Sequence, residues 1–487
     1  MTHPSTHWQQ HNQTFLRLFE ASTGVSPTWL GQYNLSGPRY TSYPTAPVWG
    51  EGPADPQAWA TAIGQADQRP LALYLHLPFC EERCLFCSCN VIITQQKERA
   101  ERYLTYLFKE IDLMVAATQA TQQPVVQVHW GGGTPTYLSS DQLARLIVKL
   151  KASFTFSPEA EIALEVDPRV TTAEQLAVLR QHGFNRLSMG VQDFDLAVQQ
   201  AVHRVQSVAQ TSALMAEARR LGFESINLDL IYGLPHQTPA SFTTTLETVV
   251  ALAPERIALY SFAFVPWVSP HQNKLDEATL PSGVDKYELF RLATRHLLEA
   301  GYIYIGMDHF AKPTDELTQA LYAGTLHRNF MGYTTRAGNA TMLSMGVSAI
   351  SALPTHYAQN VKKLSVYEAM LDADQLPVAR AYALTPNDEQ RRWVIQHLMC
   401  QTQVSKTAYQ AHWQRSWQDD FAYEDDKLAT MATQGLLTLD DDWVKLTPLG
   451  RLLSRNVAMV FDAHLAGHPA NTTTRDEQAK PLFSKTL

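Results

Sequence analysis

Six short apolar segments alternate with amphipathic helical segments between residues 71 and 263, and this alternation restricts the possible folds more than any other feature. Each apolar segment is rich in aliphatic, β-branched or aromatic residues, as expected of a strand that is buried on both faces. Between them, stretches such as 96–114 place apolar residues at i, i+3 and i+4, with charges on the other side. The sequence therefore predicts right-handed βαβ units and a parallel sheet, either open or curled into a barrel. The six predicted strands are 71–77, 125–133, 161–168, 186–192, 225–235 and 256–263.

The carboxyl ends of these predicted strands carry a recurrent set of polar, Gly and Pro residues. They read LPFCEERC, HWGGGTPT, LEVDP, GVQDF, LDLIYGLP and FAFVPW. At a single strand end, Gly and Pro would indicate no more than a turn. Six such ends share one rim of a parallel α/β barrel, which is the rim where active sites are built. We therefore expect an active site there, and we expect 301–311 to form a seventh strand or an edge extension.

The last hundred or so residues have a different pattern and predict a mostly helical domain. Two helical segments, a hairpin over 436–447 and a closing helix over 447–465 follow one another in the order of a winged helix. DNA binding is disfavoured, because 387–465 holds 11 acidic and 8 basic side chains and because Asp440, Asp441 and Asp442 form the turn of the hairpin. We interpret this domain as a packing or lid module.

The charge and hydropathy of the chain disfavour several kinds of partner. A net charge of -8 without any basic run gives no electrostatic footprint for nucleic acid or for an anionic membrane. The first 15 residues lack a cationic start and an apolar stretch, and no window approaches the roughly 18 consecutive apolar residues of a membrane span. We predict a cytosolic protein that acts on a small molecule.

The stretch CEERCLFCSC, residues 80–89, contains four of the five cysteines of the chain. So few and so clustered cysteines do not form a disulfide framework, and in a reducing compartment they indicate metal binding or redox chemistry. Structural zinc usually takes two separated pairs of ligands, which this loop lacks, although His76 could add one ligand. Iron-sulfur clusters are held by thiolates, and three ligands would leave one iron open. Cys80, Cys84 and Cys87 have the spacing CxxxCxxC, and Cys89 adds a CxC.

The three-cysteine motif after the first strand and the GGGTP loop after the second resemble the radical S-adenosylmethionine superfamily. The resemblance implies a partial parallel (β/α)6 barrel and a [4Fe-4S] cluster on Cys80, Cys84 and Cys87. It also implies that S-adenosylmethionine chelates the open iron and is cleaved to a 5'-deoxyadenosyl radical.

Further strings over nearly the whole chain resemble one family within it, the oxygen-independent coproporphyrinogen III oxidases. They are SGPRYTSYPTA, HWGGGTPTYL, GFNRLSMGVQDF, NLDLIYGLPHQT, GMDHFA, LHRNFMGYTT and MGVSAIS. The resemblance implies oxidative decarboxylation of two propionates of coproporphyrinogen III to vinyl groups, giving protoporphyrinogen IX. An electron donor and an electron acceptor, both unidentified, would take part, and the protein would be a monomer.

The match to this family also assigns cofactor residues, each of which has a structural alternative such as a strand-end cap or an ion pair. Contacts to the cluster-bound S-adenosylmethionine are expected from Tyr74, Gly132, Glu165 and Ile350. The family binds a second S-adenosylmethionine, for which the matching positions are Phe86, Gly133, Thr134, Gln192, Arg204, Asp229 and Ala263.

The predicted substrate carries four carboxylates, which suit arginine forks. Arg39, Arg328 and His309 are candidates for this contact, and Cys89 is a candidate for the substrate chemistry. After the sixth strand this chain reads FAFVP where the family often has polar residues, so two polar groups are lost.

The predicted organisation has four parts. They are an N-terminal segment over 1–55 that covers the active site, a catalytic domain over 56–355, the helical domain over 356–465 and a flexible tail over 466–487. Three alternative functions remain at this point: a haem-binding chaperone of the same family, a radical haem methyltransferase and a zinc-stapled scaffold. The SGPRYTSYP lead and the CxC favour the oxidase over the chaperone.

Overall fold

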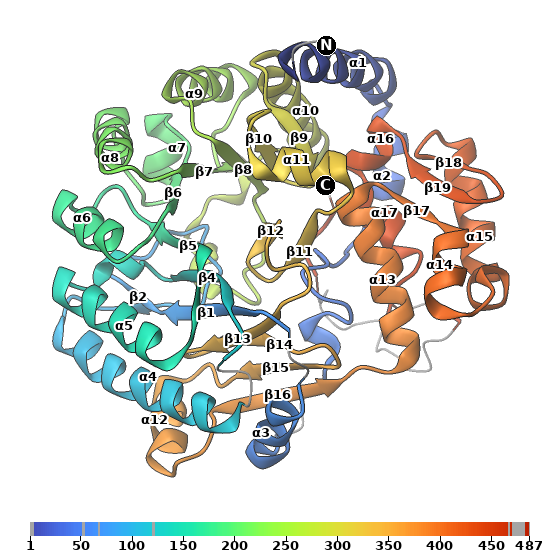
Figure 1. Ribbon diagram of the computed structural model, residues 1–487. Coiled ribbons are helices and arrows are strands. Elements are labelled where there is room, and N and C mark those ends of the chain that lie inside the picture. The colour runs from blue at the N-terminus through green and yellow to red at the C-terminus, as the bar shows by residue number, and fades with distance from the viewer. Residues whose placement is uncertain are drawn as a thin grey trace.

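The computed structural model describes residues 4–50, 54–66, 69–118, 122–465, 468–469 and 483–486. Its centre is a 12-stranded sheet in the order β16-β15-β14-β13-β1-β4-β5-β6-β7-β8-β10-β9 (Figure 1). The six predicted strands occupy consecutive positions in this sheet and are all parallel, so the predicted fold class is confirmed. They are β1 (Leu71–Leu77), β4 (Val125–Gly132), β5 (Phe156–Val166), β6 (Arg186–Gln192), β7 (Ser225–Tyr232) and β8 (Arg256–Ser261).

Amphipathic helices follow the parallel strands and cover the outer face of the sheet (Figure 1). Several begin with a capping box, as at Ser139 and Thr172, where the side chain caps the helix and a glutamine three residues later bonds back. Their apolar faces pack on alternate residues of the strands, such as Leu73 and Leu75, in one continuous core. These helices are α4 (Glu98–Ala117), α5 (Ser140–Ser153), α6 (Ala173–Gln181), α7 (Leu196–Ala201), α8 (Val208–Leu221), α9 (Pro239–Leu252) and α10 (Gly283–Glu299).

Both edges of the parallel sheet are extended by short strands. Residues 301–311 form an antiparallel hairpin on β8, made of β9 (Ile303–Gly306) and β10 (His309–Ala311), so the edge extension is the correct alternative. On the other edge, β13 (Thr341–Met345) lies parallel to β1, which the sequence did not predict. Three antiparallel strands follow it: β14 (Ile350–Ala352), β15 (His356–Asn360) and β16 (Val378–Ala383).

A separate hairpin of β11 (His327–Asn329) and β12 (Gly332–Thr334) packs against the inner side of the sheet, where Phe330 and Met331 contact Ala72. In Figure 1 it lies between the parallel strands and the C-terminal helices. The remaining short elements are β2 (Phe79–Cys80), β3 (Ile92–Ile93), η2 (Pro135–Tyr137), η3 (Pro270–Lys274), η4 (Glu277–Thr279), α11 (Glu316–Ala323) and α12 (Leu364–Asp372).

The C-terminal region has the predicted winged-helix-like order of helices and a three-stranded sheet. The predicted hairpin is present, but the predicted closing helix is broken at Leu453, whose backbone leaves the helical region, into α16 (Pro448–Leu452) and α17 (Ser454–Met459). The other elements are α13 (Pro386–Gln401), β17 (Gln403–Ser405), α14 (Lys406–Trp413), α15 (Trp417–Thr433), β18 (Leu437–Leu439) and β19 (Trp443–Leu446).

The N-terminal segment runs between the sheet and the C-terminal region. Its helices are α1 (Pro4–Thr23), which contacts α10 and α16, and α2 (Pro27–Tyr33), and η1 (Ala46–Val48) and α3 (Pro56–Gly64) follow. Between α2 and η1, the Tyr40 hydroxyl donates to Asp462 at 2.9 Å. That this segment covers the active site stays a prediction, as do the predicted domain boundaries.

The predicted tail over 466–487 lies mostly outside the described residues. Its described parts are 468–469, where His468 lies 2.9 Å from the Glu424 carboxylate, and 483–486. The second part pairs with the N-terminal segment, because Ser36 and Lys485 form an antiparallel bridge and Gly37 N–H donates to Ser484. Within the ranges that the structure covers, no helix is long and apolar enough to cross a membrane.

A buried carboxyl group ties helix α4 to the far edge of the sheet. Glu110 is fully buried and accepts hydrogen bonds from the Gly346 N–H at 2.7 Å, Asn360 Nδ2 at 2.6 Å and the Tyr367 hydroxyl at 2.5 Å. Burial raises the pKa of Glu110 to about 7, although these three donors oppose the shift. Because the folded pKa exceeds the ordinary value of 4.5, the stability contributed by the neutral acid is complete below pH 4.5 and is lost as the pH rises through about 7.

The substitution Glu110→Gln removes this titration while keeping the shape of the side chain. Between about pH 6 and about pH 8.5 we expect the wild type to lose roughly 1 to 2 kcal/mol of unfolding free energy relative to the variant. Denaturant unfolding of both proteins across this pH range measures the difference. Parallel pH profiles would contradict the assignment.

Candidate active site

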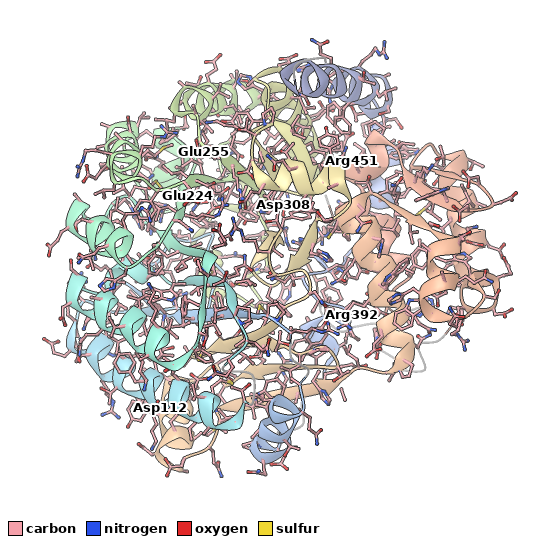
Figure 2. All side chains as sticks on the ribbon, viewed as in Figure 1. Asp112, Glu224, Glu255, Asp308, Arg392 and Arg451 are labelled. Atoms are coloured by element: carbon pink, nitrogen blue, oxygen red, sulfur yellow. The ribbon has the colours of Figure 1, made fainter. Side chains whose placement is uncertain are left out.

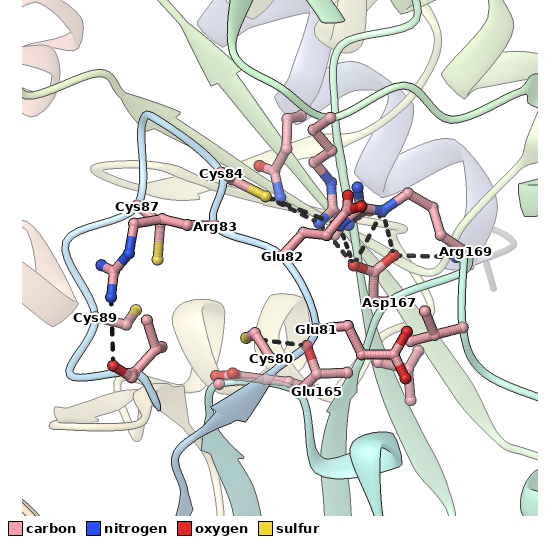
Figure 3. Close-up of a pocket in the computed structure, with 18 of the residues that line it drawn as sticks. Cys80, Glu81, Glu82, Arg83, Cys84, Cys87, Cys89, Glu165, Asp167 and Arg169 are labelled. Atoms are coloured by element: carbon pink, nitrogen blue, oxygen red, sulfur yellow. Dashed lines mark hydrogen bonds and ion pairs between the residues drawn. The ribbon is translucent and has the colours of Figure 1, made fainter. Parts of the chain in front are cut away.

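A cavity of about 420 Å³ lies at the carboxyl ends of the parallel strands, on the rim where the sequence predicts the active site (Figure 3). Its volume falls within the range of roughly 300 to 1,000 Å³ that is typical of small-molecule and cofactor pockets. The structure brings twelve of the predicted site residues together around it: Cys80, Cys84, Phe86, Cys87, Cys89, Gly132, Gly133, Thr134, Glu165, Gln192, Arg204 and Asp229.

The cysteine loop has little regular structure, and its backbone is held by neighbouring elements. At its start, β2 pairs with β3, and the Thr134 N–H donates to the Phe79 carbonyl at 2.8 Å. In the middle, the Leu85 N–H donates to Val202 at 3.0 Å. Near its end, a ring nitrogen of His271 lies 2.7 Å from the Cys87 carbonyl. These contacts fix the loop on the rim and leave its thiols at the cavity.

The four thiols are spread around the cavity rather than gathered at one point (Figure 3). In the part of the chain that the structure describes, no three His, Cys, Asp or Glu side chains are placed to hold a single metal ion. Burial raises the pKa of Cys80 to about 11. A hydrogen bond from Cys89 lowers the pKa of Cys87 to about 7 and raises that of Cys89 well above its usual value. A cluster, which offers a separate iron to each thiolate, suits this spread better than one zinc ion does.

The glycine loop after β4 is required by the packing of its neighbours. A Cβ at Gly131 would lie 2.8 Å from the Glu165 carboxylate, and one at Gly133 would lie 2.6 Å from the Phe79 carbonyl. Gly132 has a φ of 114°, in the region that favours glycine, and its N–H donates to Glu165 at 3.2 Å. The loop thus lets the carboxylate and the cysteine loop approach the end of β4 closely.

Two carboxyl groups facing the cavity have opposite pKa shifts. Burial alone would raise the pKa of Glu165, but hydrogen bonds from His129 and from the Gly132 N–H hold it below its ordinary value. Burial raises the pKa of Asp229 to about 7, and the nearby Glu165 charge acts in the same direction. Near neutral pH the cavity therefore offers one ionised carboxylate as acceptor and one carboxyl group that exchanges a proton.

Sequence reasoning missed an ion-pair cluster on the other side of the cavity. Asp167 Oδ2 lies 2.8 Å from a guanidinium nitrogen of Arg169 and 2.8 Å from one of Arg204 (Figure 3). Both arginines also approach the Cys84 sulfur, at 3.8 and 3.7 Å. Arg204 is buried, so the alternative to a cofactor contact for this residue is a buried ion pair and not one at the surface. The signal was present, because Asp167 and Arg169 stand at the end of a predicted strand.

Gln192, at the end of β6, also faces the cavity and adopts an uncommon backbone conformation. Its φ is 69°, in the left-handed region that residues other than glycine seldom occupy. Such outliers cluster at ligand-binding sites, which supports a functional hypothesis for this residue.

Three predicted cofactor residues lie outside the lining of this cavity. The Tyr74 ring stacks on His129 with a centroid distance of 6.1 Å, and the Ala263 carbonyl accepts from Gln272 at 3.1 Å. Ile350, in β14, pairs with Gln359 of β15.

The three residues predicted to contact the substrate carboxylates also lie apart from this cavity. Arg39 forms an ion pair with Asp308, and His309 contacts the rings of Tyr260 and Tyr333. Burial lowers the pKa of His309 to about 4. Arg328 donates to the Arg39 carbonyl.

Phe262 and Phe264 support the cysteine loop. Both belong to an apolar cluster that includes Leu85 and Phe86 of that loop. This apolar surface keeps water away from one side of the loop.

The chain matches known proteins over almost its whole length. Residues 74–249 match the Radical SAM superfamily and residues 384–453 match the HemN C-terminal domain. The oxygen-independent coproporphyrinogen III oxidase of Escherichia coli (strain K12) is 45% identical over 434 residues, which cover 89% of this chain and 94% of that protein. The chain belongs to the oxygen-independent coproporphyrinogen III oxidase family.

Other members of the oxygen-independent coproporphyrinogen III oxidase family are similarly close. The one of Synechocystis sp. (strain ATCC 27184 / PCC 6803 / Kazusa) is 43% identical over 90% of this chain and 94% of that protein. The one of Helicobacter pylori (strain J99 / ATCC 700824) is also 43% identical, over 94% of this chain and 98% of that protein. The solved structure of coproporphyrinogen III oxidase (HemN) from Escherichia coli, described as a radical SAM enzyme, superimposes with a TM-score of 0.86 at 42% identity. The superposition covers 91% of this chain and 100% of the chain in the solved structure.

Membership of this family makes the protein a radical S-adenosylmethionine oxidoreductase with a [4Fe-4S] cluster and S-adenosylmethionine as cofactors. The donor set of the cavity fits them, because thiols, a carboxylate and backbone groups surround one space. Two buried polar atoms at the cavity, the Tyr137 hydroxyl and Arg204 Nε, have no hydrogen-bond partner among the described residues. They are free to bond a ligand there.

The Asp167 cluster predicts a stability effect. The substitution Asp167→Asn removes the carboxylate that pairs with the buried Arg204 and the part-buried Arg169, and we expect it to cost about 3 kcal/mol of unfolding free energy. Glu217→Gln, which removes the exposed partner of Arg220, is the matched control and should cost less than about 1 kcal/mol. Equal costs in denaturant unfolding would contradict the structural role of Asp167.

Proposed function

We propose that this protein converts coproporphyrinogen III to protoporphyrinogen IX by oxidative decarboxylation of two propionate side chains to vinyl groups. The 45% identity to a coproporphyrinogen III oxidase over 94% of that protein carries the proposal. The arrangement of three cysteines of the CxxxCxxC motif around a cofactor-sized cavity supports it. The β C–H bond of a propionate is unactivated, so no side-chain base of ordinary pKa can remove that proton. When bound, the cluster and S-adenosylmethionine supply a carbon radical that takes the hydrogen atom instead.

In this proposal the thiolates of Cys80, Cys84 and Cys87 hold the cluster. Glu165 would accept hydrogen bonds from the S-adenosylmethionine that is bound to the cluster, with Tyr74, Gly132 and Ile350 nearby. A second S-adenosylmethionine would lie beside the first, against Phe86, Gly133, Thr134, Gln192, Arg204, Asp229 and Ala263. The twelve predicted residues that line one cavity support this arrangement, while Tyr74, Ala263 and Ile350 would contact the cofactors from outside its present lining.

The substrate side of the proposal rests on part-buried cationic and polar groups. Arg39 and His309 remain candidates, and the ion pair with Asp308 means that Arg39 would have to share its guanidinium with a propionate. Cys89 lies at the cavity and has a raised pKa, so it would keep its proton near neutral pH in the absence of metal. An external electron donor and acceptor, a monomeric state and a cytosolic location complete the proposal.

The decisive experiment is anaerobic incubation of the reconstituted protein with coproporphyrinogen III, S-adenosylmethionine, a reductant and a one-electron acceptor. We expect protoporphyrinogen IX, together with 5'-deoxyadenosine and methionine. Appearance of 5'-deoxyadenosine and methionine without protoporphyrinogen would overturn the substrate assignment and leave the cofactor assignment intact. A methylated haem product would favour the haem methyltransferase, and stoichiometric haem binding without turnover would favour the chaperone.

The cluster ligands are tested by iron content. Replacing Cys84 with Ser removes one of three thiolate ligands, and we expect most of the iron and acid-labile sulfide to be lost. The matched control is Cys400→Ala, because Cys400 is buried in the C-terminal core away from the cavity. Full iron content in the Cys84 variant would show that this thiol is not a ligand.

Cys89 is tested separately, because it is the fourth thiol of the loop. For Cys89→Ser we expect retained iron and a loss of turnover of about 100-fold or more, which is the scale of one general acid or base group. Iron content and protoporphyrinogen formation are measured on the same preparation. Loss of iron would instead make Cys89 a ligand.

A further inference from the structure

A second cavity, of about 150 Å³, lies where five parts of the chain meet. These are Thr41 of the N-terminal segment, Arg69 just before β1, the β11–β12 hairpin with the loop after it, the turn between β14 and β15, and helix α13. This cavity is smaller than the roughly 300 to 1,000 Å³ that is typical of pockets for drug-sized ligands. It is too small for a tetrapyrrole and is large enough for one carboxylate or phosphate group.

The charge of this cavity has one sign. Arg69, Arg328 and Arg392 line it, and among the described residues no Asp or Glu does. Guanidinium groups remain charged at every accessible pH, and their planar forks match the two oxygens of a carboxylate or phosphate. The cavity therefore combines fixed positive charge with oxyanion-matching geometry.

Arg328 is the most buried of these cations, with 6% of its surface exposed. One of its terminal nitrogens donates to the Arg39 carbonyl at 2.5 Å, and its guanidinium lies over the Tyr333 ring at 5.5 Å. Its Nε is buried and has no hydrogen-bond partner in the described chain. A buried cation that lacks a counter-charge is costly, so an anion that entered the cavity would be stabilised there.

Arg392 approaches the cavity from the C-terminal domain. It projects from α13, beside the sheet in Figure 2, and donates to the Pro354 carbonyl at 3.0 Å and to the Tyr357 hydroxyl at 3.4 Å. Both partners are neutral, so its charge is not balanced by the groups it bonds. An anion here would bridge α13 and the β11–β12 hairpin.

We propose that this cavity is an oxyanion-binding site that takes a carboxylate or phosphate group between Arg328 and Arg392. The group would belong either to a propionate arm of the tetrapyrrole substrate, which rests on the proposed function, or to a free anion such as inorganic phosphate. In both cases the bound anion joins the C-terminal domain to the barrel and, through Arg328, contacts the segment that carries Arg39.

Inorganic phosphate is the probe, and its binding to the full-length protein is measured by titration calorimetry at constant ionic strength. We expect Arg392→Met and Arg328→Met to weaken phosphate binding about tenfold each, as loss of a charge-assisted contact predicts. Arg328→Lys keeps the charge but loses the planar guanidinium fork. Its affinity for phosphate should lie between that of the two Met variants and that of the wild type. The control, Arg220→Gln, makes the same change of charge at an exposed pair on α8 and should bind phosphate as the wild type does.

The source of the anion follows from the KM for coproporphyrinogen III measured on the same variants. A KM raised in Arg392→Met, together with competition by phosphate, identifies a propionate arm. Weakened phosphate binding with an unchanged KM identifies a free anion. The proposal is overturned if neither phosphate affinity nor KM differs between the wild type and the Arg328 and Arg392 variants. Failure of the proposed function would show as absent turnover in the wild type, and the phosphate titration remains readable in that case.

Discussion

The cysteine loop cannot fix its own conformation, and the active site depends on the backbone hydrogen bonds that neighbouring elements supply to it. The loop receives them from Thr134 after β4, from Val202 after α7 and from His271 after β8. The apolar pair Phe262 and Phe264 packs beneath it. Each of these groups lies beyond the carboxyl end of a parallel strand or in the loop that follows, so the sheet places all of them on one rim. The order of the strands therefore determines where the thiols lie.

The parallel core of the fold could be predicted from the sequence because each of its strands is six or more residues long and carries apolar residues that the fold buries. The strands that the sequence did not predict are short, and their direction depends on distant partners. β13 has five residues and lies parallel to β1, while β14 has three and is antiparallel to β13. A run of three to five residues carries too little periodicity to reveal its partner. The closing helix was predicted as continuous because the break at Leu453 is a backbone feature without a Gly or Pro signal.

The candidate site shows the same limit. Residues at strand ends, such as Glu165 and Asp229, could be predicted to lie together because parallel strands converge on one rim. The pairing of Asp167 with Arg204 could not, since it joins residues 37 positions apart in the sequence through side-chain geometry. The glycine loop was predicted, but the reason for it was incomplete. Its glycines are needed for close approach to Glu165 and Phe79 as well as for any cofactor contact.

Residues 36 and 37 meet residues 483–485 in the folded protein, which has a consequence for its synthesis. Ser36 donates to the Phe483 carbonyl across 447 positions, and Gly37 bonds Ser484 beside it. Contacts of such high sequence separation form only when nearly the whole chain has left the ribosome. The six predicted strands and the cysteine loop are complete more than 200 residues earlier. A nascent chain therefore presents its thiols before Ser36 and Gly37 can form these contacts.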